Sequence, residues 1–461
     1  MRRLIFAVSG LLLLTGYSLH PSAAPQQASG GGVTLFVGAR LITDGDRPPI
    51  DDSAFLIEHD KITKVGRRNQ IQAPAGAARV DLTGKTVIPA LVNAHGHVGF
   101  QKDASFAKEN YTRENIANQL NQYAYYGVGA VMTTGTDLGD VTFELRDEPH
   151  AGALLRTAGR GFAAPNAGPG AAAMRDPPYG VTTEEEGRKY VRELAAKKPD
   201  FVKIWVDDRN GSVQKLAPSV YRAIIDEAHK HNLRVMAHVF YLADARDLVE
   251  AGADGFLHLV RDAEMDDALV ARMKQKKMFV TPNLGIAGRG IATQTPPWFD
   301  DPLLAEVYSP AAIAQVRNAA QNQGRRGGNA PNPSVPSSYD LQIRSLSKLN
   351  RAGVTIALGD DSGIQNSFSG YAELQQLERM AEAGMTPQQV LVAATRTAAQ
   401  LLRLNNMGSI APGKSADFIV LDANPLDNLA NARKISRVYL RGREIDRAAL
   451  RARWTGALAS R

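Results

Sequence analysis

Residues 86 to 97 read Thr-Val-Ile-Pro-Ala-Leu-Val-Asn-Ala-His-Gly-His, and this stretch indicates both a buried strand and a candidate site. An apolar run of the kind that forms a buried strand, residues 86–92, leads into His95 and His97. Side chains alternate along an extended segment, so histidines two positions apart point the same way and can reach one metal ion. Alone, two surface histidines would explain the pair equally well. Residues elsewhere in the chain are needed to distinguish a metal site from two surface histidines.

The middle of the chain alternates strand-like runs with amphipathic helices. Apolar residues recur at helical spacing after Pro218, again between Leu242 and Gly252, and after Thr386-Pro387. This alternation is typical of parallel βα units. It favours an α/β fold, a (β/α)8 TIM barrel over residues 90–404, with its functional groups at the carboxyl ends of the strands. An open doubly wound sheet is the alternative, but no Gly-x-Gly-x-x-Gly loop follows an early strand.

Both ends of the remaining chain have β-like sequence. Short apolar runs such as Val33–Val37 alternate with turn residues, and similar runs return at Asp417–Leu421 and Val438–Glu444. We therefore expect a small composite β-sandwich built from residues 33–89 and 405–447.

One long interruption, residues 285–338, lies within the predicted barrel. It contains Gly324-Arg325-Arg326-Gly327-Gly328 and a run rich in Pro, Asn and Ser. Loops of this length are usually functional lids or mobile segments. Since this one would leave the active face of the barrel, we favour a lid.

The first residues have the pattern of a secretory signal peptide. Arg2 and Arg3 precede a mostly apolar stretch, Leu4–Leu14, which is too short to span a bilayer, and a small-residue segment follows. We expect cleavage after Ala24, so that residues 1–24 are removed and the protein is periplasmic or secreted. A buried N-terminal helix is the alternative, and the glycines within the stretch disfavour it.

The composition excludes several kinds of site. The chain of 461 residues has no cysteine, which rules out disulfides, thiol nucleophiles, zinc–thiolate sites and a lipid-carrying cysteine, so any metal must be held by nitrogen and oxygen. Part of the net charge of +7 lies in the signal, and no basic block is interleaved with aromatic residues. We expect neither nucleic-acid binding nor a stable membrane anchor. A serine hydrolase would lack its nucleophile, because no Gly-x-Ser-x-Gly is present.

Further metal-binding residues stand at other strand ends. His238 and His258 each end a strand-like run, and Asp361 ends another. Because the carboxyl ends of barrel strands meet at one mouth, these side chains would converge with the His-x-His pair. The other histidines lie outside strand ends, and we interpret them as surface or capping residues: His20, His59, His150, His229 and His231.

Lys203, within an apolar strand-like run, allows two interpretations. Burial lowers the pKa of a lysine and exposes a neutral amine, which can react with carbon dioxide to give a carbamate that bridges two metals. Alternatively the ammonium is paired with Asp207 or Asp208. The residue alone favours the pairing.

The segment Val87–His97 closely resembles the signature with which amidohydrolases enter their first barrel strand. The resemblance continues through the strand-end residues above and closes with Gly408–Phe418, which is similar to the family's return into its β-sandwich. It covers essentially the whole mature chain. Within the superfamily the pattern is similar to the imidazolonepropionase-like branch, in particular to members that cleave Xaa-Pro or other dipeptides and N-acyl amino acids, including ochratoxin-hydrolysing amidases.

The resemblance implies a hydrolase acting on carbon–nitrogen bonds of a small-molecule amide or peptide. It implies two divalent ions, zinc in the relatives, bridged by a carboxylated lysine, although manganese and cobalt accept the same ligands. The implied ligands are His95, His97, Lys203, His238, His258 and Asp361. The first two histidines and Asp361 would hold the more buried ion, and the other two histidines the second. A hydroxide bridging the ions would attack the carbonyl, with Asp361 as general acid and base.

Two positions depart from the family pattern. The family usually has Gly-Thr-Asp where this chain has Gly359-Asp360-Asp361, so the register assigns catalysis to Asp361 but leaves the choice between the two aspartates open. The histidine of the fourth run is followed by Leu259-Val260-Arg261, where relatives often have a glycine, which predicts altered substrate contacts.

Tyr241 and Arg246 follow His238 and are candidate contacts for a substrate, with a packing tyrosine and a solvated arginine as the alternative. A cyclic-amide hydrolase or deaminase with one metal is a second candidate function. An inactive exported metal- or ligand-binding protein is a third. The sequence is compatible with a homo-oligomer.

Overall fold

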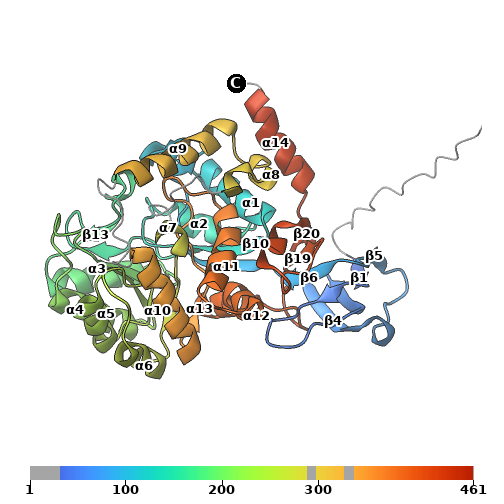
Figure 1. Ribbon diagram of the computed structural model, residues 1–461, viewed down its shortest axis with the longest axis horizontal. Helices are drawn as coiled ribbons and strands as arrows, with labels where there is room; N and C mark the ends of the chain where they lie inside the picture. The colour runs from blue at the N-terminus through green and yellow to red at the C-terminus, as the bar shows by residue number, and fades with distance from the viewer. Residues whose placement is uncertain (1–31, 288–296, 327–336, 460–461) are drawn as a thin grey trace, which may run out of the picture.

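The computed structural model describes residues 32–287, 297–326 and 337–459. Helices gather around parallel strands in the larger part of the molecule, and a small β-rich part lies beside it, at the right of Figure 1. The predicted signal peptide, residues 1–24, lies outside the described residues.

Parallel strands form the centre of the larger part. One sheet has the order β11-β10-β7, and the other has the order β13-β12-β14-β15-β16-β17-β18, with every pairing parallel. The strands are β7 (Leu91–Gly96), β10 (Val128–Thr133), β11 (Leu154–Thr157), β12 (Phe162–Ala163), β13 (Tyr179–Gly180), β14 (Val202–Val206), β15 (Val235–Val239), β16 (Gly255–Phe256), β17 (Phe279–Val280) and β18 (Thr355–Ile356).

Backbone hydrogen bonds connect both edges of the three-stranded sheet to the seven-stranded sheet. The Ala94 amide of β7 donates to the Leu358 carbonyl just past β18, at 2.9 Å, and a parallel bridge joins Gly96 to Ser362. At the other edge the Asp200 amide, before β14, donates to the Thr157 carbonyl of β11 at 2.8 Å. Chain segments from the start and the end of the central region therefore lie side by side.

Helices follow most of these strands, and their ends have identifiable causes. Their bounds are α1 (Arg113–Tyr125), α2 (Val141–Asp147), α3 (Glu184–Ala196), α4 (Pro218–Lys230), α5 (Leu242–Ala251), α6 (Asp267–Gln275), α10 (Ser338–Ala352), α11 (Tyr371–Glu382), α12 (Pro387–Val392) and α13 (Ala398–Leu401). The predicted helix starts at Pro218 and after Thr386 are confirmed, as is the end of α5 at Gly252, whose φ of 95° suits a glycine. Between α12 and α13 the helix passes through a π-helical turn, Ala393–Thr397.

The β-rich part contains strands from both ends of the chain. One sheet has the order β4-β3-β1-β5 and the other the order β2-β6-β19-β20-β21. The strands are β1 (Val33–Val37), β2 (Arg40–Leu41), β3 (Ser53–Glu58), β4 (Lys61–Arg67), β5 (Ala78–Asp81), β6 (Thr86–Pro89), β19 (Phe418–Leu421), β20 (Ile435–Leu440) and β21 (Arg443–Glu444). Aromatic rings pack between the two sheets: Phe36 stacks on Phe55 at 4.9 Å between centroids, and Phe418 meets both edge-on.

The run of residues 86–92, predicted as one strand, is divided at Ala90. The Ala90 amide donates to the Asp417 carbonyl, whereas the next amide, of Leu91, donates to Gly127, both at 3.0 Å. Pro89 has no amide hydrogen and ends β6, so the chain passes at this point from the β-rich part into the central sheets. The prediction of a single strand was wrong because periodicity does not reveal a change of partner.

The described residues of the interruption at 285–338 form several helices where a long loop was predicted. Its described residues include α7 (Leu284–Ala287), η5 (Pro297–Asp300), α8 (Pro302–Ala305) and α9 (Pro310–Arg326). Two of these helices begin with a proline after a capping residue: Asp301 caps α8, and the Ser309 hydroxyl accepts from the Ala312 amide at 3.0 Å. Residues 288–296 and 327–336 lie outside the described part.

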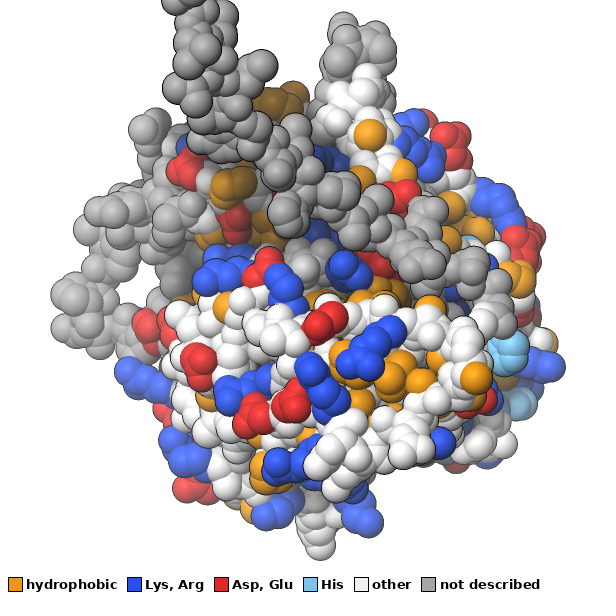
Figure 2. Space-filling view, turned by 90° about the vertical axis from the view of Figure 1, so that its right-hand side faces the viewer, with side chains coloured by type: hydrophobic (Ala, Val, Ile, Leu, Met, Phe, Trp, Pro, Cys, Tyr) orange, Lys and Arg blue, Asp and Glu red, His pale blue; other side chains and the backbone are white. Residues whose placement is uncertain are grey.

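A final helix, α14 (Arg447–Ala459), follows the β-rich part and packs back on α1 through Trp454, 5.4 Å from Tyr125 between ring centroids. On the face that Figure 2 shows, Lys and Arg side chains are interspersed with Asp and Glu. None of the described helices is long and apolar enough to cross a bilayer.

Candidate metal centre

One cavity of about 410 Å³ brings the predicted metal ligands together at the carboxyl ends of the central strands. Its walls include His95, His97, Lys203, His238, His258 and Asp361. The first five are carried by β7, β14, β15 and the segments just beyond β7 and β16, and Asp361 follows β18. Residues far apart in the sequence therefore meet as the strand-end argument predicted.

Asp361 lies at the centre of this group. Its Oδ1 is 2.9 Å from His97 Nε2 and 3.4 Å from His95 Nε2. Its Oδ2 is 3.9 Å from His258 Nε2. The ligand atoms of His95, His97 and Asp361 all lie within 4.8 Å of one another, an arrangement that fits a divalent ion held by nitrogen and oxygen.

The charges in the cavity favour the protonation states that a metal ion requires. Burial lowers the pKa of His95, and the charge of Lys203 lowers it further, so the ring is neutral near pH 7. Burial also lowers the pKa of His238, to about 4. Although burial acts to raise the pKa of Asp361, the histidines and Lys203 hold that pKa far below its usual range.

Lys203 is buried, with its Nζ 5.0 Å from the centre of the Trp205 ring. Burial lowers its pKa to about 7, so a substantial fraction of the amine is neutral near pH 7. Lys203 forms no ion pair with Asp207 or Asp208, so the pairing interpretation was wrong. Asp207 Oδ2 instead lies 3.0 Å from His238 Nε2, and Asp208 accepts from the Tyr241 hydroxyl at 2.7 Å.

Hydrogen bonds from surrounding residues fix the rings. The Asp207 contact occupies Nε2 of His238 and leaves its Nδ1 for a metal. His97 Nδ1 lies 2.8 Å from the Thr136 hydroxyl, and His95 Nδ1 lies 2.6 Å from the Asn283 amide nitrogen. Sequence reasoning missed Asn283, although it stands just past strand β17, where the strand-end rule would have found it.

His258, like His95, has its Nδ1 beside the Asn283 amide nitrogen. Its Nδ1 is 3.1 Å from Arg261 Nη2 and 3.1 Å from the Asn283 amide nitrogen. Because a guanidinium can only donate, this Nδ1 accepts, and the neutral ring then carries its proton on Nε2. In this arrangement the protonated Nε2 of His258 lies 3.9 Å from Asp361 Oδ2, too far for a hydrogen bond, and His258 would ligate a metal through Nε2 only after the ring changed tautomer.

The two adjacent aspartates point to different partners. Asp360 Oδ1 accepts from the Asn93 side chain at 2.9 Å and from the Ser362 amide at 3.0 Å. The same Asn93 amide donates to Glu373 of α11 at 2.6 Å. Burial, and then the charge of Glu373, raise the pKa of Asp360 well above its usual value. Only Asp361 therefore faces the histidines, as the register indicated.

Comparison with known proteins identifies the family. The Amidohydrolase family matches residues 86–445, most of the chain. The chain belongs to the amidohydrolase family. Its predicted class, a hydrolase acting on carbon–nitrogen bonds, is confirmed by this membership.

Several relatives align with most of this amidohydrolase, although their sequence identity to it is low. Imidazolonepropionase of Streptomyces avermitilis is 24% identical over 409 residues, covering 86% of this chain and 87% of that protein. Ochratoxinase of Aspergillus niger is 23% identical over 437 residues, covering 85% and 82%. The crystal structure of a Xaa-Pro dipeptidase with bound methionine in the active site superposes with a TM-score of 0.69 at 21% identity, covering 89% of this chain and 99% of that one.

The two predicted substrate contacts of this amidohydrolase do not line the metal-centred cavity. Tyr241 is bonded to Asp208, and its ring lies 4.7 Å from Lys215 Nζ. Arg246 forms an ion pair with Asp266, and its side chain is 57% exposed. The solvated-arginine interpretation therefore describes Arg246. Arg261, by contrast, does line the cavity.

The remaining histidines fall into two groups. His229 lies 2.9 Å from Asp254 Oδ2 on the exposed surface, and His59 and His231 are also exposed, as predicted. His150 is partly buried, and in the described part of the chain neither ring nitrogen has a hydrogen-bond partner, so the surface interpretation was wrong there. His20 lies outside the described residues.

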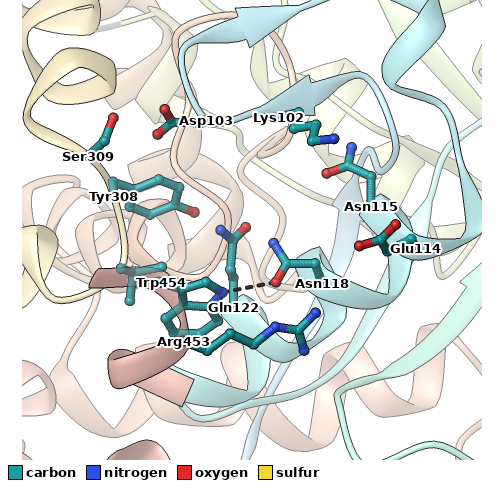
Figure 3. A pocket seen from close by; sticks show the side chains of 11 residues that line it. Lys102, Asp103, Glu114, Asn115, Asn118, Gln122, Tyr308, Ser309, Arg453 and Trp454 are labelled. Carbon is teal, nitrogen blue, oxygen red and sulfur yellow. Dashed lines mark hydrogen bonds between the residues drawn. The ribbon is translucent and has the colours of Figure 1, made fainter. Parts of the chain in front are cut away.

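A second cavity of about 200 Å³ lies between α1 and α14 and does not include any predicted ligand (Figure 3). The interruption at 285–338 contributes Val307, Tyr308 and Ser309 to this second cavity. None of the described residues of the interruption lines the metal-centred cavity. The described part of the chain therefore gives no support to the predicted lid.

Proposed function

We propose that this amidohydrolase is a metal-dependent enzyme that hydrolyses linear amide bonds in dipeptides or N-acyl amino acids. The observation that carries the proposal is the approach of Asp361 to His95 and His97 inside a cavity that also holds Lys203. Buried histidines kept neutral beside a carboxylate kept ionised form a site for a divalent cation.

Two ions fit the residues better than one if Lys203 is carboxylated. His95, His97 and Asp361 would hold the first ion, and His238, through Nδ1, and His258 would hold the second, with the Lys203 carbamate between them. Bound divalent ions would make water a stronger nucleophile and polarise the scissile carbonyl. The lowered pKa of Lys203 supports carbamate formation, because only the neutral amine reacts with carbon dioxide.

Asp361 is suited to move the proton. Its strongly lowered pKa keeps the carboxylate ionised but makes it a weak base, so it would accept a proton from a water whose own pKa bound metal ions had lowered. Its Oδ2 lies 3.9 Å from His258 Nε2, and from Asp361 the proton would pass to the departing nitrogen. Water then adds its oxygen to the carbonyl carbon while the carbon–nitrogen bond breaks, and the amine leaves with the transferred proton.

We also propose that the central strands close into one (β/α)8 barrel and that the β-rich part is a composite β-sandwich. The Ala94–Leu358 and Asp200–Thr157 hydrogen bonds, which join the two edge strands of the three-stranded sheet to the seven-stranded sheet, support closure. The aromatic packing of Phe36, Phe55 and Phe418 between the other two sheets supports the sandwich.

Product analysis tests the function. Zinc-supplemented protein and a chelator-treated control are incubated with Xaa-Pro dipeptides, N-acyl amino acids and cyclic amides, and the products are identified by mass spectrometry. We expect cleavage of the linear amides only, lost on chelation and regained when zinc is returned. Failure to cleave any of them with metal bound would contradict the proposal and favour a binding protein.

A single-metal cyclic-amide hydrolase or deaminase is a second candidate, favoured by the spacing of the ligand atoms. In the described residues the group with metal-binding spacing comprises only His95, His97 and Asp361. One metal per chain, activity insensitive to bicarbonate and ring opening as the sole reaction would identify this function.

A further inference from the structure

A guanidinium group lies in the wall of the metal-centred cavity. Arg261 is partly buried and lines the cavity beside His258, with its Nη2 3.1 Å from the Nδ1 of that ring. Its guanidinium carbon is 5.7 Å from the centre of the Phe240 ring. Its Nε is buried and, among the described residues, has no hydrogen-bond partner. Most of the donors of this side chain are therefore unused by the protein.

Arg261 also forms no ion pair among the described residues. In the described part of the chain, no carboxylate lies within 4.0 Å of its guanidinium nitrogens. The acidic side chains that interact electrostatically with Arg261 are Asp361 and Asp207. Both of them contact histidines and neither forms an ion pair with Arg261. A partly buried cation without a partner is unfavourable, and an anion brought in by a ligand would offset that cost.

We propose that Arg261 binds the free carboxylate of the amino acid that the reaction releases. This inference rests on the proposed amide hydrolysis. It predicts that the enzyme requires a free terminal carboxylate on its N-acyl amino acid or dipeptide substrates. The planar guanidinium presents paired donors that match a carboxylate. In these substrates the carboxylate is one carbon away from the nitrogen that leaves. Arg261 and Asp361 line the same cavity, so Arg261 would hold the carboxylate while the scissile carbonyl faces Asp361.

The alternative is that Arg261 only orients His258. Loss of the guanidinium would then affect every substrate alike, because the same ring serves them all. A role in substrate binding predicts instead that the effect depends on the carboxylate. The two roles are separated by comparing a free acid with its uncharged carboxamide.

The experiment uses N-acetyl-L-phenylalanine and N-acetyl-L-phenylalanine amide with the zinc-loaded wild type, Arg261→Gln and Arg261→Lys. Arg246→Gln is the matched control, since that arginine is exposed, paired with Asp266 and outside the cavity. Metal content and circular dichroism are measured for each variant. Binding of both compounds to metal-free protein is measured by calorimetry.

We expect the wild type to prefer the acid, and Arg261→Gln to lower kcat/KM for the acid by about 10- to 100-fold, as for loss of a charged hydrogen bond, with little change for the amide. Arg261→Lys should retain part of the preference, and Arg246→Gln all of it. Equal losses for acid and amide, or a wild type that does not distinguish them, would overturn the proposal.

The calorimetry keeps this inference separate from the proposed function. If the wild type hydrolyses neither compound, amide hydrolysis fails as the function. Acid binding that is weakened by Arg261→Gln and unaffected by Arg246→Gln would still support carboxylate recognition. Equal binding of acid and amide by the wild type would overturn it.

Discussion

Asp361 combines a central position among the histidines with a left-handed backbone, at a φ of 60°. Asparagine tolerates this conformation, so Asp361→Asn should preserve the local structure. We expect metal content to fall less than turnover, which should drop about 10²- to 10⁴-fold because proton transfer is lost. Steady-state kinetics and metal analysis measure both quantities.

Asp360→Asn is the control for this substitution, since the Asp360 side chain bonds to Asn93 and Ser362 and faces away from the histidines. It should retain most of the activity. Full activity of Asp361→Asn, or equal losses in the two variants, would contradict the role assigned to Asp361.

The site could be predicted in part from single residues. Strand-end position was sufficient for His95, His97 and Asp361, because barrel topology brings those ends together. Partner choice was not predictable: nothing local to Asp207 says that it pairs with His238 rather than Lys203. Arg246 was selected for its charge, which carries no information about the direction of a side chain on a helix.

Asp137 should make stability depend on pH. It is buried and accepts from the hydroxyls of Thr133, Thr142 and Thr157, yet burial raises its pKa from 3.8 to about 6. The folded state thus prefers the protonated acid. Its contribution to stability is complete below about pH 4 and is lost as the pH rises through about 6, a change of about 3 kcal/mol.

Urea denaturation at pH 4 and at pH 7.5 measures this contribution. Asp137→Asn, which is neutral throughout, should reduce the stability difference between the two pH values relative to the wild type. Asp267→Asn, whose side chain is 91% exposed, should leave that difference unchanged. An unaltered difference in Asp137→Asn would show that this carboxyl group titrates normally in the folded protein.

At the scale of elements, the turn after β18 must approach β7 closely. Gly363 has a φ of 81°, and a Cβ there would lie 1.8 Å from the His97 carbonyl oxygen. Gly363→Ala should therefore cost more than the roughly 1–2 kcal/mol that a left-handed non-glycine residue costs alone. The free energy of unfolding measures this loss.

Gly76→Ala is the matched comparison, because Gly76 has a φ of 80° and no atom within 4 Å of a Cβ. Both substitutions strain the backbone, and only the first meets the carbonyl of the metal-binding segment. Equal destabilisation of the two variants would mean that the close approach between β7 and this turn is unimportant.

The ends of helices and strands were predictable where they depend on the backbone preference of a single residue. They were not predictable where they depend on contacts with distant segments. Pro218 and Gly252 mark helix ends through their own backbone preferences, so those ends were predictable. The division at Ala90 depends on which strands lie on either side. Within 285–338, glycines, prolines and polar residues obscured short helices whose capping residues, such as Asp301, could have been recognised.

At the scale of the whole molecule, the class of fold was predictable because alternating strands and helices have few compact arrangements. The pairing of the two ends was suggested only by their shared β-like composition. The structure gives it a register, with Val87 opposite Val420 and Thr86 opposite Leu421. Register depends on contacts between distant segments, which a single sequence does not display.

That pairing also constrains how the protein is made. A ribosome completes β6 long before it reaches β19, and the neighbouring pair Lys85 and Asp422 is 337 residues apart. Throughout that interval the edge of β6 is open to pairing with other nascent chains, the condition under which β-strands aggregate. Closure of the β-rich part is therefore postponed to the end of translation, so dependence on chaperones should be greatest for chains that stall before residue 418.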